Sequence, residues 1–145
     1  MRELPRQLSA DELAELFEGR TRFVERLAEI DDPLGRADEV LAMLGEEDKV
    51  AALNAHPAIG AKRLSPRSAG EQGSDADPAV LSELAYLNQV YEEKFGFRFV
   101  VFVAGRSKAE ILQVLQERLG RTREEELDTG CRELVAIAKD RWTRT

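Results

Sequence analysis

The chain has 145 residues, the usual length of one domain, and we expect residues 1–145 to fold as a single unit. Hydrophobic residues make up 43% and charged residues 34%, a composition that excludes an intrinsically disordered chain. The formal net charge of -7 argues against binding to nucleic acid or to an anionic membrane surface, both of which favour basic faces. No apolar run approaches the roughly 20 residues that span a bilayer, and the acidic start does not resemble a signal peptide, so we expect a cytoplasmic location.

The chain contains one cysteine, Cys131, and one histidine, His56. An intramolecular disulfide is therefore impossible, and a zinc site of the usual histidine and cysteine type cannot be built within one chain. No acidic loop has the spacing of a calcium site, and the glycines are too scattered for a phosphate-binding loop. We therefore expect no metal.

The first third of the chain predicts short helices. Ser9 and Glu12 form a capping box that opens the first of them. Residues 21–30 give a second amphipathic helix, and residues 36–53 read as a third. Gly45 lies inside that third span, where a glycine can divide a helix.

The helical period disappears over residues 54–77, a stretch much longer than the usual loop of roughly 4–6 residues, and such loops are often functional. It returns in residues 78–95, which follow an Asp-Pro helix start, and in two further helices over residues 107–120 and 122–142. Between them, residues 97–103 have strand-like composition but no second strand to pair with. We predict an all-α, single compact domain of six or seven helices with one long functional loop and a short extended buried segment.

The long loop gathers the residues that could carry chemistry. His56 opens it, and Pro57 restricts the backbone beside that imidazole. A histidine exchanges protons near neutral pH because its ordinary pKa is about 6.5. Three cations and no acid lie between His56 and Gly70, namely Lys62, Arg63 and Arg67. This local reversal of sign suits a small anionic ligand, and Glu71 could orient the imidazole or bind donor groups of that ligand.

The residues alone leave simpler interpretations open, and composition favours them. A single histidine is more often structural than catalytic. Ser68 and Glu71 have the spacing of one more capping box, and the three cations could form a solvated edge. A serine triad lacks the Gly-x-Ser-x-Gly elbow, and Cys131 lies in the apolar stripe of the last helix, where a core role is more common than a nucleophilic one.

Several short motifs occur in an order and spacing that are specific as a set. They are His56-Pro57-x-Ile59-Gly60, Ser68-x-x-Glu71-Gln72, Leu87-Asn88-x-x-Tyr91, Lys94-Phe-Gly-Phe97-x-Phe99-Val100 and Gly105-Arg106. Together they resemble the 2-oxo-4-hydroxy-4-carboxy-5-ureidoimidazoline (OHCU) decarboxylases over nearly the whole chain.

The resemblance implies an all-α homodimer that uses no metal or organic cofactor. Its reaction would be the loss of CO2 from OHCU to give (S)-allantoin, after urate oxidase and 5-hydroxyisourate hydrolase. His56 matches the catalytic proton donor, and Glu71 matches the second essential side chain. The positions that match substrate contacts are Pro57, Ser68, Ala69, Gly70, Glu71, Gln72, Phe99, Val100, Val101, Phe102 and Val103.

Arg106 directly follows the segment 97–103 and is our candidate, with Arg63 and Arg67, for binding the substrate carboxylate. No side-chain role follows for Phe102 or Arg98, which fall where side chains of the family vary. Two rival interpretations remain: a non-catalytic helical interaction module, which need not keep His56 and Glu71, and a hydrolase of a related cyclic ureide that would use the same pair to activate water.

Overall fold

The computed structural model describes residues 3–57 and 77–144. Within these ranges the chain forms seven helices and no strand, which confirms the all-α prediction. The helices are α1 (Ala10–Phe17), α2 (Arg22–Leu27), α3 (Ala37–Met43), α4 (Glu46–Ala55), α6 (Pro78–Phe95), α7 (Lys108–Arg118) and α8 (Arg123–Arg144).

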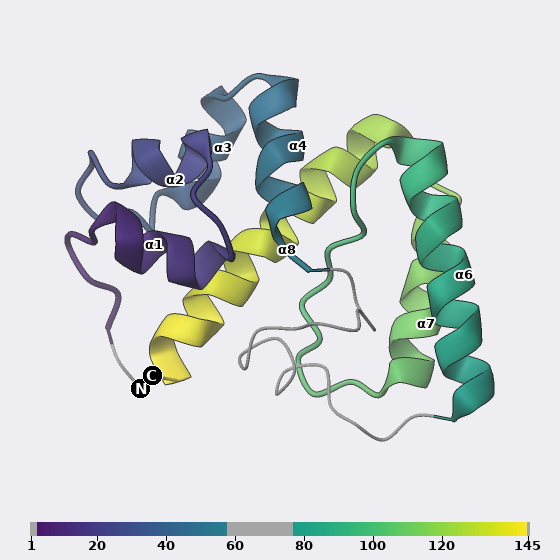
Figure 1. Ribbon diagram of the computed structural model, residues 1–145. Coiled ribbons are helices and arrows are strands. Elements are labelled where there is room, and N and C mark those ends of the chain that lie inside the picture. The colour runs from purple at the N-terminus through teal and green to yellow at the C-terminus, as the bar shows by residue number, and fades with distance from the viewer. Residues whose placement is uncertain (1–2, 58–76, 145) are drawn as a thin grey trace.

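The C-terminal helix α8 organises the fold. It runs across the molecule, with α1 to α4 gathered around one part of it and the α6–α7 pair at its other end (Figure 1). Helices α1, α3 and α4 pack directly on α8, and α6 packs against α7. Gly130 allows α8 to pack closely on α4. A Cβ atom at Gly130 would lie only 3.2 Å from a methyl group of Leu53.

The helix starts that the sequence predicts are present. Ser9 accepts the backbone N–H of Glu12 while the Glu12 carboxylate accepts the backbone N–H of Ser9, and Ser107 makes the same box with Glu110. Asp77 caps α6. These caps satisfy backbone donors that have no partner within the helix, so the helices begin where the sequence places them.

The prediction of a single helix over residues 36–53 is wrong. The chain forms two helices there, divided at Gly45 as the sequence suggested. Leu44 and Gly45 both take extended backbone conformations, with ψ of 154° and 165°, so α3 ends at Met43 and α4 begins at Glu46. The helix predicted over 21–30 is also shorter and ends at Leu27. Helix α4 continues through Ala55, two residues beyond the predicted end at residue 53.

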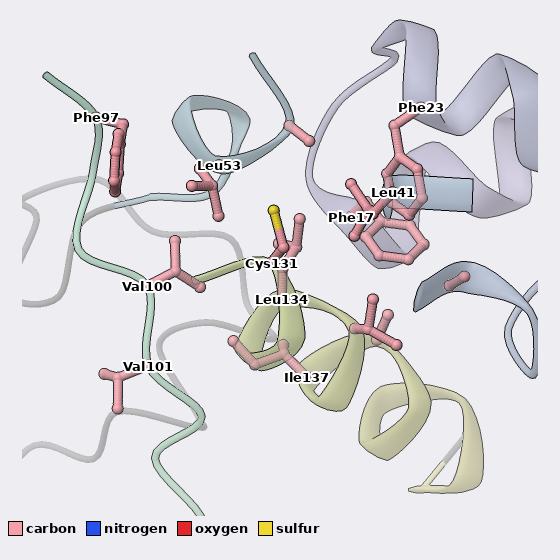
Figure 2. Close-up of a cluster of buried hydrophobic side chains, with 14 of the residues drawn as sticks. Phe17, Phe23, Leu41, Leu53, Phe97, Val100, Val101, Cys131, Leu134 and Ile137 are labelled. Atoms are coloured by element: carbon pink, nitrogen blue, oxygen red, sulfur yellow. The ribbon is translucent and has the colours of Figure 1, made fainter. Parts of the chain in front are cut away.

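Residues 97–103 form the predicted extended buried segment, which lies between α8 and the α6–α7 pair (Figure 1). Phe97 and Phe99 pack with Tyr91 of α6, at ring-centroid distances of 6.0 and 5.3 Å. Val100 instead lies in the core with Leu53 of α4 and residues of α8 (Figure 2). The segment therefore packs against α6 through its aromatic side chains and against α4 and α8 through Val100.

Candidate active site

His56 is the residue at which α4 ends. Its backbone N–H still donates to the carbonyl of Leu53 at 3.1 Å, but its ψ of 136° turns the chain out of the helix. Only 7% of the residue is exposed, and within residues 3–57 and 77–144 its buried Nδ1 atom has no hydrogen-bond partner. Burial, followed by the positive charge of Arg141, lowers the pKa of His56 to about 4. The imidazole is therefore neutral at pH 7.

An ion pair between Glu18, near the N-terminus, and Arg141, near the C-terminus, changes the pKa of this imidazole. Nη1 of Arg141, on α8, lies 3.1 Å from Oε1 of Glu18 and donates to the carbonyl of Leu16 at 2.9 Å. Arg141 lowers the pKa of His56 and Glu18 raises it, so both charges lie close enough to bias its protonation. Arg141 is 2% exposed, and a cation buried this deeply must be paired.

A close contact between Gly19, just after α1, and Ala55, the last residue of α4, brings Glu18 to this place. Gly19 lies against Ala55, and a Cβ atom at Gly19 would be only 2.9 Å from the Ala55 Cβ. Glu18 itself ends α1 with a φ of 65°, the left-handed region that non-glycine residues adopt rarely. Such backbone strain is concentrated at functional sites, where the surrounding structure holds it.

The extended segment 97–103 is held by side chains instead of a neighbouring strand. The Arg98 N–H donates to Asn54 Oδ1 at 3.0 Å, and the Phe102 N–H donates to Glu133 Oε1 at 3.2 Å. In the part of the chain that the structure describes, no hydrogen bond is formed by the N–H groups of Val100 and Val101. Backbone donors of this kind can pair with the amides of a ring-shaped ligand.

A buried ionic network supports the same segment from the α7–α8 side. Arg118 donates to the carbonyl of Val100 at 2.8 Å and to Glu126 at 2.7 Å. Glu126 is fully buried and also accepts from the Tyr91 hydroxyl at 2.6 Å and from Arg121 at 3.0 Å. The Arg118 guanidinium lies 4.6 Å from the centre of the Phe99 ring. These contacts fix the middle of the segment.

The structure describes part of the site that the sequence predicts. Pro57 follows His56 and is half-buried. Phe99, Val100, Val101 and Val103 are buried, and Phe102 is half-buried. The remaining predicted site residues, Ser68, Ala69, Gly70, Glu71 and Gln72, lie outside the described residues, as do Lys62, Arg63 and Arg67. The described portion thus brings His56 and the extended segment together, and Glu71 stays a prediction.

Arg106 directs its guanidinium back onto the segment that precedes it. Its Nη2 donates to the carbonyl of Phe102 at 2.6 Å and its Nε to that of Val103 at 3.1 Å. Glu18 and Arg141, by contrast, were missed in the sequence. Arg141 could have been found, because it continues the apolar stripe of the last helix after Leu134 and Ala138.

Other regions of the described chain offer less chemistry. A hollow of about 280 Å³ lies between α3, α4 and α8; it is lined by Asp38, Leu41, Ala42, Lys49, Asp128, Cys131 and Arg132. Burial raises the pKa of the Cys131 thiol to about 11, so this cysteine is not an activated nucleophile. Residues 3–57 and 77–144 contain no cluster of three histidine, cysteine or acidic side chains able to hold a metal ion. None of their helices is long and apolar enough to cross a membrane.

Comparison with known protein families shows which family the chain belongs to. The family model described as OHCU decarboxylase matches residues 2–143. The chain belongs to the OHCU decarboxylase family. A solved structure of an OHCU decarboxylase in the presence of (S)-allantoin superimposes with a TM-score of 0.78 and 26% sequence identity, over 92% of this chain and 96% of that one. The family fold is therefore present over almost the full length.

Relatives of this OHCU decarboxylase family member include longer proteins. The uric acid degradation bifunctional protein PucL of Bacillus subtilis is 27% identical over 97% of this chain and 31% of its own length. The 2-oxo-4-hydroxy-4-carboxy-5-ureidoimidazoline decarboxylase of Halalkalicoccus jeotgali is 31% identical over 64% of this chain and 56% of its own length. The chain thus spans between about a third and just over half of these two curated relatives.

Proposed function

We propose that this protein decarboxylates OHCU to (S)-allantoin. The observation that carries the proposal is the position of His56, the only histidine of the chain, at the end of α4 beside the ion pair of buried Arg141 with Glu18. Membership of the OHCU decarboxylase family supplies the reaction class. The proposal includes the expectations from family resemblance that Glu71 is essential and that no cofactor takes part.

The substrate contains its own electron sink. Its carboxylate-bearing carbon lies beside a C=N–C=O system of the ring, which can take up the electron pair that departing CO2 leaves behind. The protein then has to hold the C–CO2 bond in line with this π system and to offer fixed donors to the ring heteroatoms. The N–H groups of Val100 and Val101, which bond no other residue that the structure describes, are donors of that kind on a segment held by Arg118.

His56 supplies the proton that replaces CO2 on one face of the ring. In the unliganded protein the imidazole is neutral at pH 7, because burial and Arg141 lower its pKa to about 4. A bound carboxylate favours the imidazolium form, since opposite charges raise the pKa of a neighbouring histidine. His56 therefore takes up a proton as the substrate binds and delivers it after CO2 leaves.

Arg141 is the described cation best placed to bind the substrate carboxylate. Its charge lowers the pKa of His56 more than the charge of Arg98 does, and Arg106 directs its guanidinium away onto the carbonyls of Phe102 and Val103. Arg141→Lys should then raise KM by roughly tenfold, the usual cost of one charge-assisted hydrogen bond. A larger rise in KM for Arg106→Ala than for Arg141→Lys would return Arg106 to this role.

The activity is tested by generating OHCU in place from urate with urate oxidase and 5-hydroxyisourate hydrolase. Circular dichroism then follows the appearance of one allantoin enantiomer, and CO2 release separates decarboxylation from hydrolysis of the ring. We expect stereospecific allantoin formation by the wild type and only the spontaneous rate with His56→Asn. Full activity in His56→Asn, or a racemic product from the wild type, would contradict the proposal.

We extend the proposal to the setting of the enzyme. The Bacillus relative is named for uric acid degradation, which supports a place after urate oxidase and 5-hydroxyisourate hydrolase. A homodimer and a cytoplasmic location are further expectations from the family resemblance and the composition. Sedimentation velocity at micromolar concentration tests the dimer directly.

A further inference from the structure

Both peptide groups that flank the Cα atom of His56 are held by hydrogen bonds. On the N-terminal side the His56 N–H donates to the carbonyl of Leu53 at 3.1 Å. On the C-terminal side the His56 carbonyl accepts a hydrogen bond from Nη1 of Arg98 at 2.8 Å. With both peptide planes held, the direction of the Cα–Cβ bond is set, and only the side-chain torsions of the imidazole remain.

Arg98 makes this contact from the start of the extended segment, and it is bound to the same end of α4 twice. Its backbone N–H donates to Asn54 Oδ1 at 3.0 Å, while its guanidinium reaches His56 two residues later. Glu92 on α6 lies on the other side of the guanidinium, with 3.7 Å between Glu92 Oε1 and Arg98 Nε. The arginine thus joins α4, α6 and the extended segment around the backbone of His56.

The contact differs from those that stabilise the core. The Arg98 side chain is 37% exposed, so truncating it removes little buried apolar surface. The Asn54 contact already ties the extended segment to α4, and the guanidinium adds a bond to the carbonyl of one particular residue. That residue is the one histidine of the chain.

We propose that Arg98 is a positioning residue for His56, holding the His56 carbonyl so that the buried imidazole keeps one orientation beside segment 97–103. The inference rests on the proposed function, in which His56 delivers a proton to one face of the substrate. Misplacing a catalytic group by about 1 Å can cost roughly 100-fold in rate, so loss of one of two anchors should lower kcat.

Arg98→Met tests the proposal, because it keeps the length of the side chain and removes its charge and donors. We expect kcat for allantoin formation to fall by roughly tenfold, KM to change by less than about threefold, and Tm to fall by only about 2–4 °C, as for an exposed side chain. Arg98→Lys keeps the charge and one donor and should recover part of kcat. Arg36→Met is the matched control: it removes one exposed arginine from a pair with Glu39 and should leave kcat unchanged.

The second measurement does not depend on activity. The imidazole carbon–proton NMR signals of this chain all come from His56, so they report its surroundings without further assignment. The charges that act on His56 come from Arg141 on α8, Glu18 after α1 and Arg98. In Arg98→Met the signals should move and their titration midpoint should rise, since one of the two cations is removed. In Arg36→Met both should match the wild type.

Unchanged kcat with unmoved imidazole signals in Arg98→Met would overturn the proposal. So would a fall in kcat that comes with an equal loss of folded protein while the signals of the folded fraction stay in place. If Arg98→Met does not fold, Asn54→Ala, which removes only the acceptor of the Arg98 N–H, must move the same signals. If the wild type forms no allantoin, the proposed function fails, and the imidazole signals alone still decide whether Arg98 positions His56.

Discussion

Lowering the pH should destabilise this protein through its single histidine. Burial and Arg141 lower the pKa of His56 to about 4 in the folded state, whereas an unfolded histidine titrates near 6.5. Between these two pH values the imidazole of His56 is mostly protonated in the unfolded chain and mostly neutral in the folded protein. Stability is therefore fully present above about pH 6.5 and is lost as the pH falls toward about 4.

The size of this effect follows from the two pKa values. One pKa unit corresponds to about 1.4 kcal/mol, so the complete loss on acidification is roughly 3 kcal/mol, of which about 2 kcal/mol is reached by pH 5. Only 7% of His56 is exposed, so solvent reduces the effect little. For a domain of this size, with a typical stability of about 5–15 kcal/mol, that is a large fraction.

Urea unfolding at pH 7 and pH 5 measures the loss, and His56→Gln isolates the contribution of the histidine. Glutamine stays neutral over this range, whereas the acidic side chains titrate in both proteins. The free energy of unfolding of the wild type should fall by about 2 kcal/mol more than that of His56→Gln. Equal losses in the two proteins, or an NMR titration midpoint at or above 6.5 for the wild-type imidazole, would refute the reasoning.

Three further predictions follow from the packing and charges around the site. The logarithm of kcat/KM should decline steadily between pH 6 and 8, because both values lie above the His56 pKa of about 4 in the free enzyme, which must take up a proton as the substrate binds; a level pH–rate profile from pH 6 to 8 would contradict this. Gly19→Ala should destabilise the fold by about 1–3 kcal/mol in urea unfolding, because the new methyl group meets Ala55, and Ala55→Gly in the same chain should restore much of the loss. Glu126→Gln should cost about 3–5 kcal/mol because it leaves the buried Arg118 charge uncompensated, and a fall in Tm of under 2 °C would contradict that role.

Helix ends were predictable because capping is a local interaction. Ser9 and Ser107 each bond a residue three positions later, and Gly96 ends α6 with a φ of 82°, so a few neighbouring residues carry the whole signal. The break between α3 and α4 was less readable. Apolar residues continue through it at helical spacing, but Leu44 and Gly45 become extended because both helices pack on α8.

The burial of residues 97–103 was predictable from composition, whereas the groups that hold them were not. The segment is bonded by Asn54, Glu133 and Arg118, which are distant in sequence and carry no pattern that relates them to it. A strand would have had a repeating ladder to predict. An extended segment held by individual side chains has none, so its partners become visible only in the folded structure.

The ion pair beside His56 was not predicted from the sequence either, but one feature of the sequence could have indicated it. Arg141 lies near the C-terminal end of α8, where basic residues ordinarily interact with the helix dipole in solvent, so this position alone does not indicate burial. Its register is the informative feature, because it follows Leu134 and Ala138 on the buried stripe. A buried cation on such a stripe needs a partner, which here is Glu18 together with the carbonyl of Leu16. With Arg141 already paired in this way, a substrate carboxylate would have to share it with Glu18, so binding an anion there and protonating His56 become one coupled event.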